Sequence, residues 1–68
     1  NYRPIISVHD NCITVKGNER LAVDVYSMSG RSVAHRSGTD VTISVADKGI
    51  YIVKATGKDG STVRKVII

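Results

Sequence analysis

Leu21-Ala22-Val23-Asp24-Val25-Tyr26 is the stretch that decides the fold. Leu21, Val23 and Val25 fall on one side of an alternation, and Asp24 falls on the other. Successive side chains of a β-strand point to opposite faces, so this period of two predicts a strand with one buried and one solvated face. A helix would repeat its apolar positions every three or four residues instead.

The composition of the chain agrees with a β fold. Its 68 residues include ten Val and eight Ile, but only four Ala, one Glu and no Gln. β-branched side chains favour strands, whereas the straight-chain residues that favour helices are almost absent. A chain of this length holds one small domain, which excludes large enzyme architectures.

Similar alternations separated by turn residues recur along the chain, as in an all-β sandwich or a small barrel. The strongest turn signal is Gly57-Lys58-Asp59-Gly60, and Gly17-Asn18-Glu19 and Ser37-Gly38-Thr39-Asp40 are further predicted turns. We expect one antiparallel β-sandwich of two sheets and about seven short strands. The expected strands are residues 5–8, 12–16, 21–26, 32–36, 41–45, 50–56 and 61–68.

The alternation also predicts which side chains form the core of the sandwich. Lys54 is expected to face water, and Cys12 is expected to be a half-buried strand thiol that forms no internal disulfide, because it is the only cysteine. The residues expected to point inward are Ile13, Val15, Leu21, Val23, Val25, Val33, Val41, Ile43, Val45, Tyr51, Val53 and Ala55.

No pattern in the chain indicates catalysis or a cofactor. His9, Asp10 and Cys12 are close in sequence, but a zinc site needs three or four ligands, and His35 stands alone. No G-x-S-x-G elbow, phosphate-binding glycine loop or calcium loop is present. We therefore expect no enzyme activity, no metal, no cofactor and no small-molecule substrate.

The charge of the chain points to no nucleic-acid partner. The net charge is +4, but the ten basic residues are spread among strands and turns, with Arg64-Lys65 as the one adjacent pair. Three Tyr and no Phe or Trp are too few for a base-stacking platform. No apolar run is long enough to span a membrane. The end strands could pair with another chain, so an edge-strand dimer is possible.

Three segments together resemble a known family: residues 25–33 (VYSMSGRSV), 49–55 (GIYIVKA) and 64–68 (RKVII). In this order and spacing they are similar to the C-terminal sorting domain of proteins exported by the type IX secretion system of Bacteroidetes. That family has a strand ending V-Y followed by G-R, then a G-x-Y strand, then a basic and aliphatic tail. Asp47-Lys48 stands where many members have Pro, and the common Asn-Pro opening is only echoed by Asn1-Tyr2-Arg3-Pro4.

The resemblance implies an export signal in folded form with an immunoglobulin-like, seven-stranded sandwich. It implies a fused N-terminal cargo that passes through the periplasm and the outer-membrane translocon to the outer membrane, cell surface or medium. A sortase-like surface peptidase then removes the domain, and the cargo is attached to anionic lipopolysaccharide. The chain opens on Asn1 rather than Met, so we expect residues 1–68 to be one C-terminal sorting domain, excised or released from a larger parent.

The resemblance also assigns roles to individual residues. Arg31 would either pair with a carboxylate of the sandwich or contact a receptor. The terminal four residues would either pair with a receptor strand or only complete the core. The rival to the whole interpretation is an immunoglobulin-like accessory or adhesion module with no signal role. The translocon or sortase recognition residues expected are Lys65, Val66, Ile67, Ile68, Gly30 and Arg31, and the structural ones are Gly49 and Tyr51.

Overall fold

The computed structural model describes residues 4–68, which form five antiparallel strands and no helix. The predicted all-β class is confirmed, but the predicted count of about seven strands is wrong. No helix within this range could cross a membrane. Of the four residues that echo the Asn-Pro opening, residues 1–3 lie outside the described part and Pro4 lies within it. The strands are β1 (Ile5–His9), β2 (Cys12–Ser27), β3 (Ser32–Ser44), β4 (Ile50–Gly57) and β5 (Gly60–Ile67).

Two of the strands are long because two predicted turns do not reverse the chain. β2 runs through Gly17-Asn18-Glu19, and β3 runs through Ser37-Gly38-Thr39-Asp40. The β2–β3 register moves from Lys16 opposite Asp40 to Leu21 opposite Gly38, so several residues of β2 face a single residue of β3. Such a bulge bends and twists a strand while pairing continues on both sides of it.

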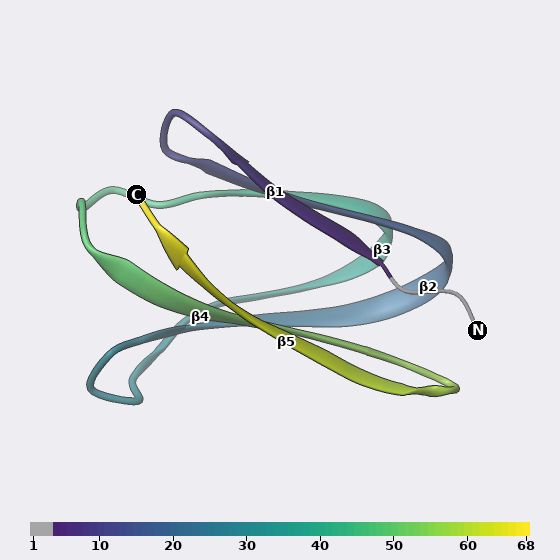
Figure 1. Ribbon diagram of the computed structural model, residues 1–68. Helices are drawn as coiled ribbons and strands as arrows, with labels where there is room; N and C mark the ends of the chain where they lie inside the picture. The colour runs from purple at the N-terminus through teal and green to yellow at the C-terminus, as the bar shows by residue number, and fades with distance from the viewer. Residues whose placement is uncertain (1–3) are drawn as a thin grey trace.

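The bends fold one sheet into two layers, in place of the two separate sheets that we expected. The first layer holds β1, residues 12–16 of β2 and residues 40–44 of β3. The second layer holds residues 32–38 of β3, residues 21–27 of β2, then β4 and β5. Figure 1 shows β2 and β3 curving from one layer to the other. The immunoglobulin-like likeness stays a prediction.

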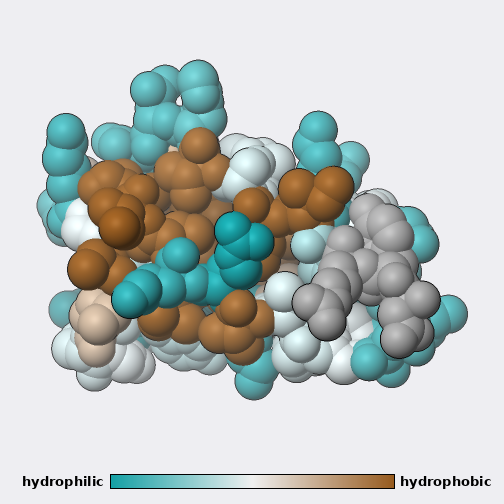
Figure 2. All heavy atoms as spheres, viewed as in Figure 1, coloured by the Kyte–Doolittle hydropathy of each residue, from teal (hydrophilic) through white to brown (hydrophobic). Residues whose placement is uncertain are grey.

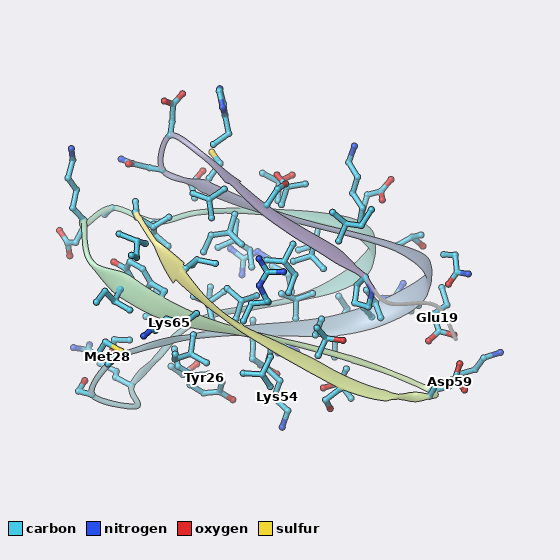
Figure 3. All side chains as sticks on the ribbon, viewed as in Figure 1. Glu19, Tyr26, Met28, Lys54, Asp59 and Lys65 are labelled. Carbon is cyan, nitrogen blue, oxygen red and sulfur yellow. The ribbon has the colours of Figure 1, made fainter. Side chains whose placement is uncertain are left out.

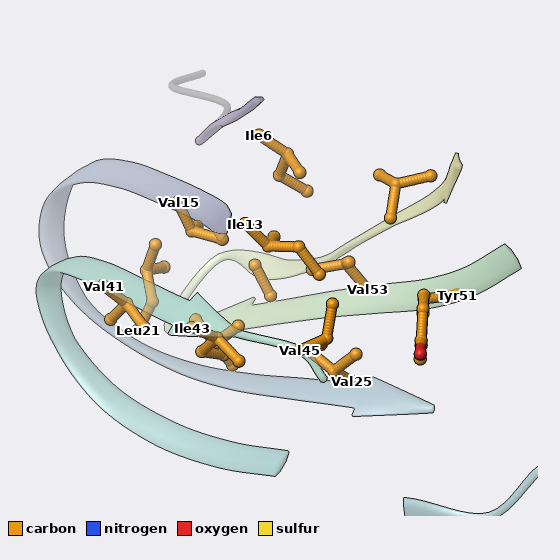
Figure 4. Close-up of a cluster of buried hydrophobic side chains, with 13 residues drawn as sticks. Ile6, Ile13, Val15, Leu21, Val25, Val41, Ile43, Val45, Tyr51 and Val53 are labelled. Atoms are coloured by element: carbon orange, nitrogen blue, oxygen red, sulfur yellow. The ribbon is translucent and has the colours of Figure 1, made fainter. Parts of the chain in front are cut away.

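The core lies between the two layers and is made only of hydrophobic side chains, with no buried polar or charged residue in the described part. Figure 4 shows these side chains meeting from both layers. Burial of each contributes about 1.5–3 kcal/mol, which is the main favourable term in folding. The buried residues are Ile6, Ile13, Val15, Leu21, Val23, Val25, Val41, Ile43, Val45, Tyr51, Val53, Ala55 and Val66.

Val33 is the one predicted core residue that the structure places outside. It is 43% exposed, because the β2–β3 register jumps from Val25 opposite Ala34 to Tyr26 opposite Ser32. The jump leaves Val33 as the extra residue of a second bulge, and Ala34 packs against the core in its place.

Candidate functional site

The strand registers bring the separated motif segments together at one end of the second layer. Tyr26 of β2 lies opposite Ile52 of β4, and Ile52 lies opposite Lys65 of β5. Ile50 and Ile67 form the next outward-facing pair. Figure 1 shows the C-terminus, the start of β4 and the turn after β2 at the same end of the molecule.

These side chains make a surface on the outer face of the second layer, which we call the terminal patch. Met28 is 61% exposed, Ile67 73% and Ile50 38%, so a substantial apolar area faces solvent. In Figure 3, Tyr26, Met28 and Lys65 lie on the side of the layer away from β1. An exposed apolar surface on a small domain is a candidate interaction site. The terminal patch comprises Tyr26, Ile50, Ile52, Lys65 and Ile67 of the strands, together with Met28 of the turn after β2.

The electrostatics of the same face change in the next row of the sheet. There Asp24 lies opposite His35 on one side and opposite Lys54 on the other. His35 Nδ1 and Asp24 Oδ1 are 2.5 Å apart. The carboxylate is therefore engaged within its own row. The terminal patch itself contains no carboxylate and one cation, Lys65, so it suits a partner that is apolar and anionic.

The terminal motif is divided between core and surface by the alternation of β5. Val66 is buried and Ile68 packs against the core, whereas Lys65 and Ile67 are exposed. The backbone of Ile68 is bonded in both directions to Gly49, at 2.9 and 3.2 Å. Among residues 4–68, β5 pairs only with β4, so no strand of the described part pairs with its other edge. The tail thus completes the core and also offers a strand edge.

Gly30 and Arg31 lie in the turn between β2 and β3. Gly30 has φ of +87°, a conformation that side-chain-bearing residues rarely adopt. Its N–H donates to the carbonyl oxygen of Ser27 at 2.9 Å, and the Ser27 N–H donates to that of Arg31 at 2.9 Å. Arg31 is exposed, and no carboxylate within residues 4–68 forms an ion pair with it.

Gly49 and Tyr51 hold the connection into β4. The Tyr51 ring is buried, and its hydroxyl donates to the Asp47 carbonyl oxygen at 2.6 Å. This bond satisfies the one polar atom that the ring brings into the core, so Tyr51 anchors the loop. The burial agrees with the expectation that Tyr51 points inward.

Sequence reasoning missed four members of the terminal patch, Tyr26, Met28, Ile50 and Ile52. The outward direction of Ile50 and Ile52 follows from the same alternation that identifies the core, since these two residues flank the inward-facing Tyr51. The position of Ile50 and Ile52 beside Lys65 does not follow from the alternation, because it depends on the register of β4 with β5.

An open groove lies at the other end of the second layer, where the β4–β5 hairpin meets the bulge of β2. Glu19 Oε2 accepts the Lys58 N–H at 3.2 Å, and Glu19 Oε1 lies 4.0 Å from Lys58 Nζ. Figure 3 shows Glu19 and Asp59 together at this end, away from the terminal patch. Glu19 therefore ties the hairpin to the bulge, which is a structural task.

The short His9, Asp10 and Cys12 segment does not assemble into a site. His9 Nε2 lies 3.5 Å from Asp10 Oδ2, with both side chains almost fully exposed. The Cys12 thiol instead contacts the Ser44 hydroxyl at 3.5 Å and is half-buried, as expected for a strand thiol. Within residues 4–68 no group of three potential metal ligands comes together.

Comparison with known families matches most of the chain. A family model described as the secretion system C-terminal sorting domain covers residues 9–68. No curated protein matches the chain significantly. The matched range contains β2 to β5 and every residue of the terminal patch.

Proposed function

The chain belongs to the family of secretion system C-terminal sorting domains, and from this premise we propose that it is the sorting signal of a type IX cargo protein. A domain of this family directs an attached protein to a secretion system, so the protein that carries it is exported. The proposed recognition surface is the terminal patch together with Gly30 and Arg31. No catalytic step is assigned to the domain.

The observation that carries the proposal is the convergence of the motif segments. Residues far apart in sequence, such as Tyr26, Ile52 and Lys65, are neighbours across three strands. They lie on the exposed face, where packing of the core does not constrain them. Arg31 supports the proposal as well, because it is exposed and has no carboxylate partner within the described residues.

In the finer proposal, the partners of the domain are the outer-membrane translocon and a sortase-like surface peptidase. The translocon would contact the terminal patch, and the peptidase would remove the domain from its cargo. The cargo would then be attached to anionic lipopolysaccharide at the cell surface or released. The excess of basic residues, a net charge of +4, is compatible with a route along anionic surfaces.

An export assay tests the proposal. Residues 1–68 are fused behind a passenger enzyme that has an inner-membrane leader, and passenger at the surface or in the medium of a type IX-competent cell is measured. We expect export of the fusion and its loss when residues 65–68 are deleted. Because this deletion removes the buried Val66, a second variant changes only the exposed Ile67→Ser and Arg31→Gln, which leave the core intact.

The control is Thr42→Ser, a change on the exposed outer face of the first layer. It should leave export unchanged, and circular dichroism of the isolated domains should show the same fold for the control and the double variant. Normal export of both the deletion and the double variant would contradict the proposal. That outcome would favour the accessory or adhesion module.

A further inference from the structure

The backbone of β5 presents its free hydrogen-bonding groups at every second residue. In an antiparallel ladder, residue pairs alternate between those that exchange two hydrogen bonds and those that exchange none. Ile68 and Gly49 exchange both bonds, and the β4–β5 register is unbroken back to Gly60 opposite Gly57. The N–H and C=O groups of Val63, Lys65 and Ile67 therefore point to the unpaired edge.

The same three residues direct their side chains to the outer face. Val63 is 58% exposed, and Lys65 and Ile67 are exposed members of one face of β5. Along the free edge, the exposed side chains are therefore the apolar Val63, the cationic Lys65 and the apolar Ile67. Figure 2 shows hydrophobic residues gathered where β1 and β5 lie in Figure 1, around a strip of hydrophilic residues.

A strand that joined this edge would place one side chain directly beside each of the three. Opposite charges across a strand pair stabilise it, and like charges directly opposite destabilise it. The complementary strand is thus apolar opposite Val63, acidic opposite Lys65 and apolar opposite Ile67. Main-chain bonds would supply affinity, and the charge pair would set the register.

A second copy of the chain does not meet this requirement. In the register centred on residue 65, two β5 edges paired antiparallel about a two-fold axis would place Val63 opposite the partner's Ile67, which is favourable. The same register would place Lys65 directly opposite the partner's Lys65, which is repulsive. Lysine on an exposed edge is a known way to prevent such self-pairing.

We propose that the free edge of β5 binds, by antiparallel strand addition, a partner strand with an acidic residue between two apolar ones, and that Lys65 selects this strand and rejects a second copy. The inference rests on the proposed function for the source of the partner, which is a protein of the export machinery. Beyond the proposed function, the inference states the chemistry of the partner strand and names Lys65 as the residue that recognises it.

The test mixes the unchanged chain with a variant of the same chain whose β5 edge carries an acidic residue. Lys65→Glu reverses the charge at the centre of the edge, so a mixture of this variant with the unchanged chain places opposite charges across the two-fold pair. Sedimentation equilibrium should give an association constant about tenfold higher for the mixture than for either chain alone, because repulsion is replaced by attraction. Added salt should reduce the difference.

Lys48→Glu is the matched control, since Lys48 is exposed in the connection before β4 and carries the same charge change away from the edge. Chemical shifts of the Val63, Lys65 and Ile67 amides should move in the Lys65→Glu mixture. Equal association in the two mixtures, or no association in either at about 1 mM, would overturn the inference.

The cellular arm separates this inference from the proposed function. Lys65→Glu in the passenger fusion should abolish export, and Lys65→Arg should preserve it. Normal export with Lys65→Glu, combined with loss of export on deletion of residues 65–68, would overturn the inference and leave the proposed function standing. Normal export in both would overturn the proposed function.

Discussion

Gly49 and Ile68 exchange two backbone hydrogen bonds, from the Ile68 N–H at 2.9 Å and from the Gly49 N–H at 3.2 Å. The last residue of the chain is thereby the final rung of the β4–β5 ladder rather than a loose tail. It holds the exposed pair of Ile50 and Ile67 in register beside it. The terminal motif is therefore presented in a fixed geometry.

Removal of Ile68 should destabilise the domain. The two hydrogen bonds contribute about 0.5–1.5 kcal/mol each, and the Ile68 side chain adds some apolar burial. The free energy of unfolding should therefore fall by about 2 kcal/mol. Urea unfolding followed by circular dichroism measures it. Ile67→Thr is the control, because Ile67 is exposed, and its effect should be within about 0.5 kcal/mol. Equal effects of the two changes would contradict this account of the ladder.

Tyr51→Phe should cost about 1 kcal/mol, because it removes the hydroxyl that donates to the Asp47 carbonyl oxygen and keeps the buried ring. Thermal unfolding with and without the substitution gives the difference. Tyr26→Phe is the comparison, since the Tyr26 hydroxyl forms no hydrogen bond within residues 4–68. A loss as large for Tyr26→Phe would show that the Tyr51 bond is not the cause.

Gly57→Ala should destabilise the β4–β5 hairpin by about 1 kcal/mol, because the Glu19 carboxylate would have to move and would lose the hydrogen bond from the Lys58 N–H. A Cβ on Gly57 would collide with Glu19 Oε2 and approach Leu21 Cδ2 to 3.0 Å. The same substitution should cost less in a Glu19→Ala background, where the carboxylate is absent. A double-mutant cycle on unfolding free energies checks this. Strict additivity would mean that Glu19 does not limit the space at Gly57.

Hydrogen exchange along β5 should alternate. The amides of Arg64 and Val66 point to β4 and should be protected, whereas those of Lys65 and Ile67 point to the free edge and should exchange rapidly. Exchange of the 68-residue chain followed by NMR at low protein concentration measures each amide. Protection of all four would show that the edge is covered, and would contradict the assignment of a free edge.

The buried faces of the strands could be predicted because burial follows the period of two. Val23 and Val25 are inward as expected, since no interruption falls between them. Val33 could not be placed in this way, because one extra residue in β3 shifts every following side chain to the other face. A bulge depends on the partner strand, which local alternation does not identify.

The strand count failed for a related reason. Gly17-Asn18-Glu19 has the composition of a hairpin turn, yet it bends β2 without ending it. Small and polar residues suit both a reversal and a bulge, and only the pairing of β2 with β3 distinguishes the two. The motif predicts that residues 65–68 take part in recognition, but the neighbourhood of Tyr26, Ile52 and Lys65 could be found only from the register of three strands.

β2 is shared by both layers, because its two halves pair with β1, β3 and β4 on either side of its bend. The two layers also share one hydrophobic core, so loss of either layer would expose the buried side chains of the other to water. The domain should therefore unfold in a single cooperative step. We expect no intermediate in which β4 and β5 stay paired with β2 while the first layer is unfolded. A destabilised domain would then lose the terminal patch completely when it unfolds, and no partly folded form would still present the patch.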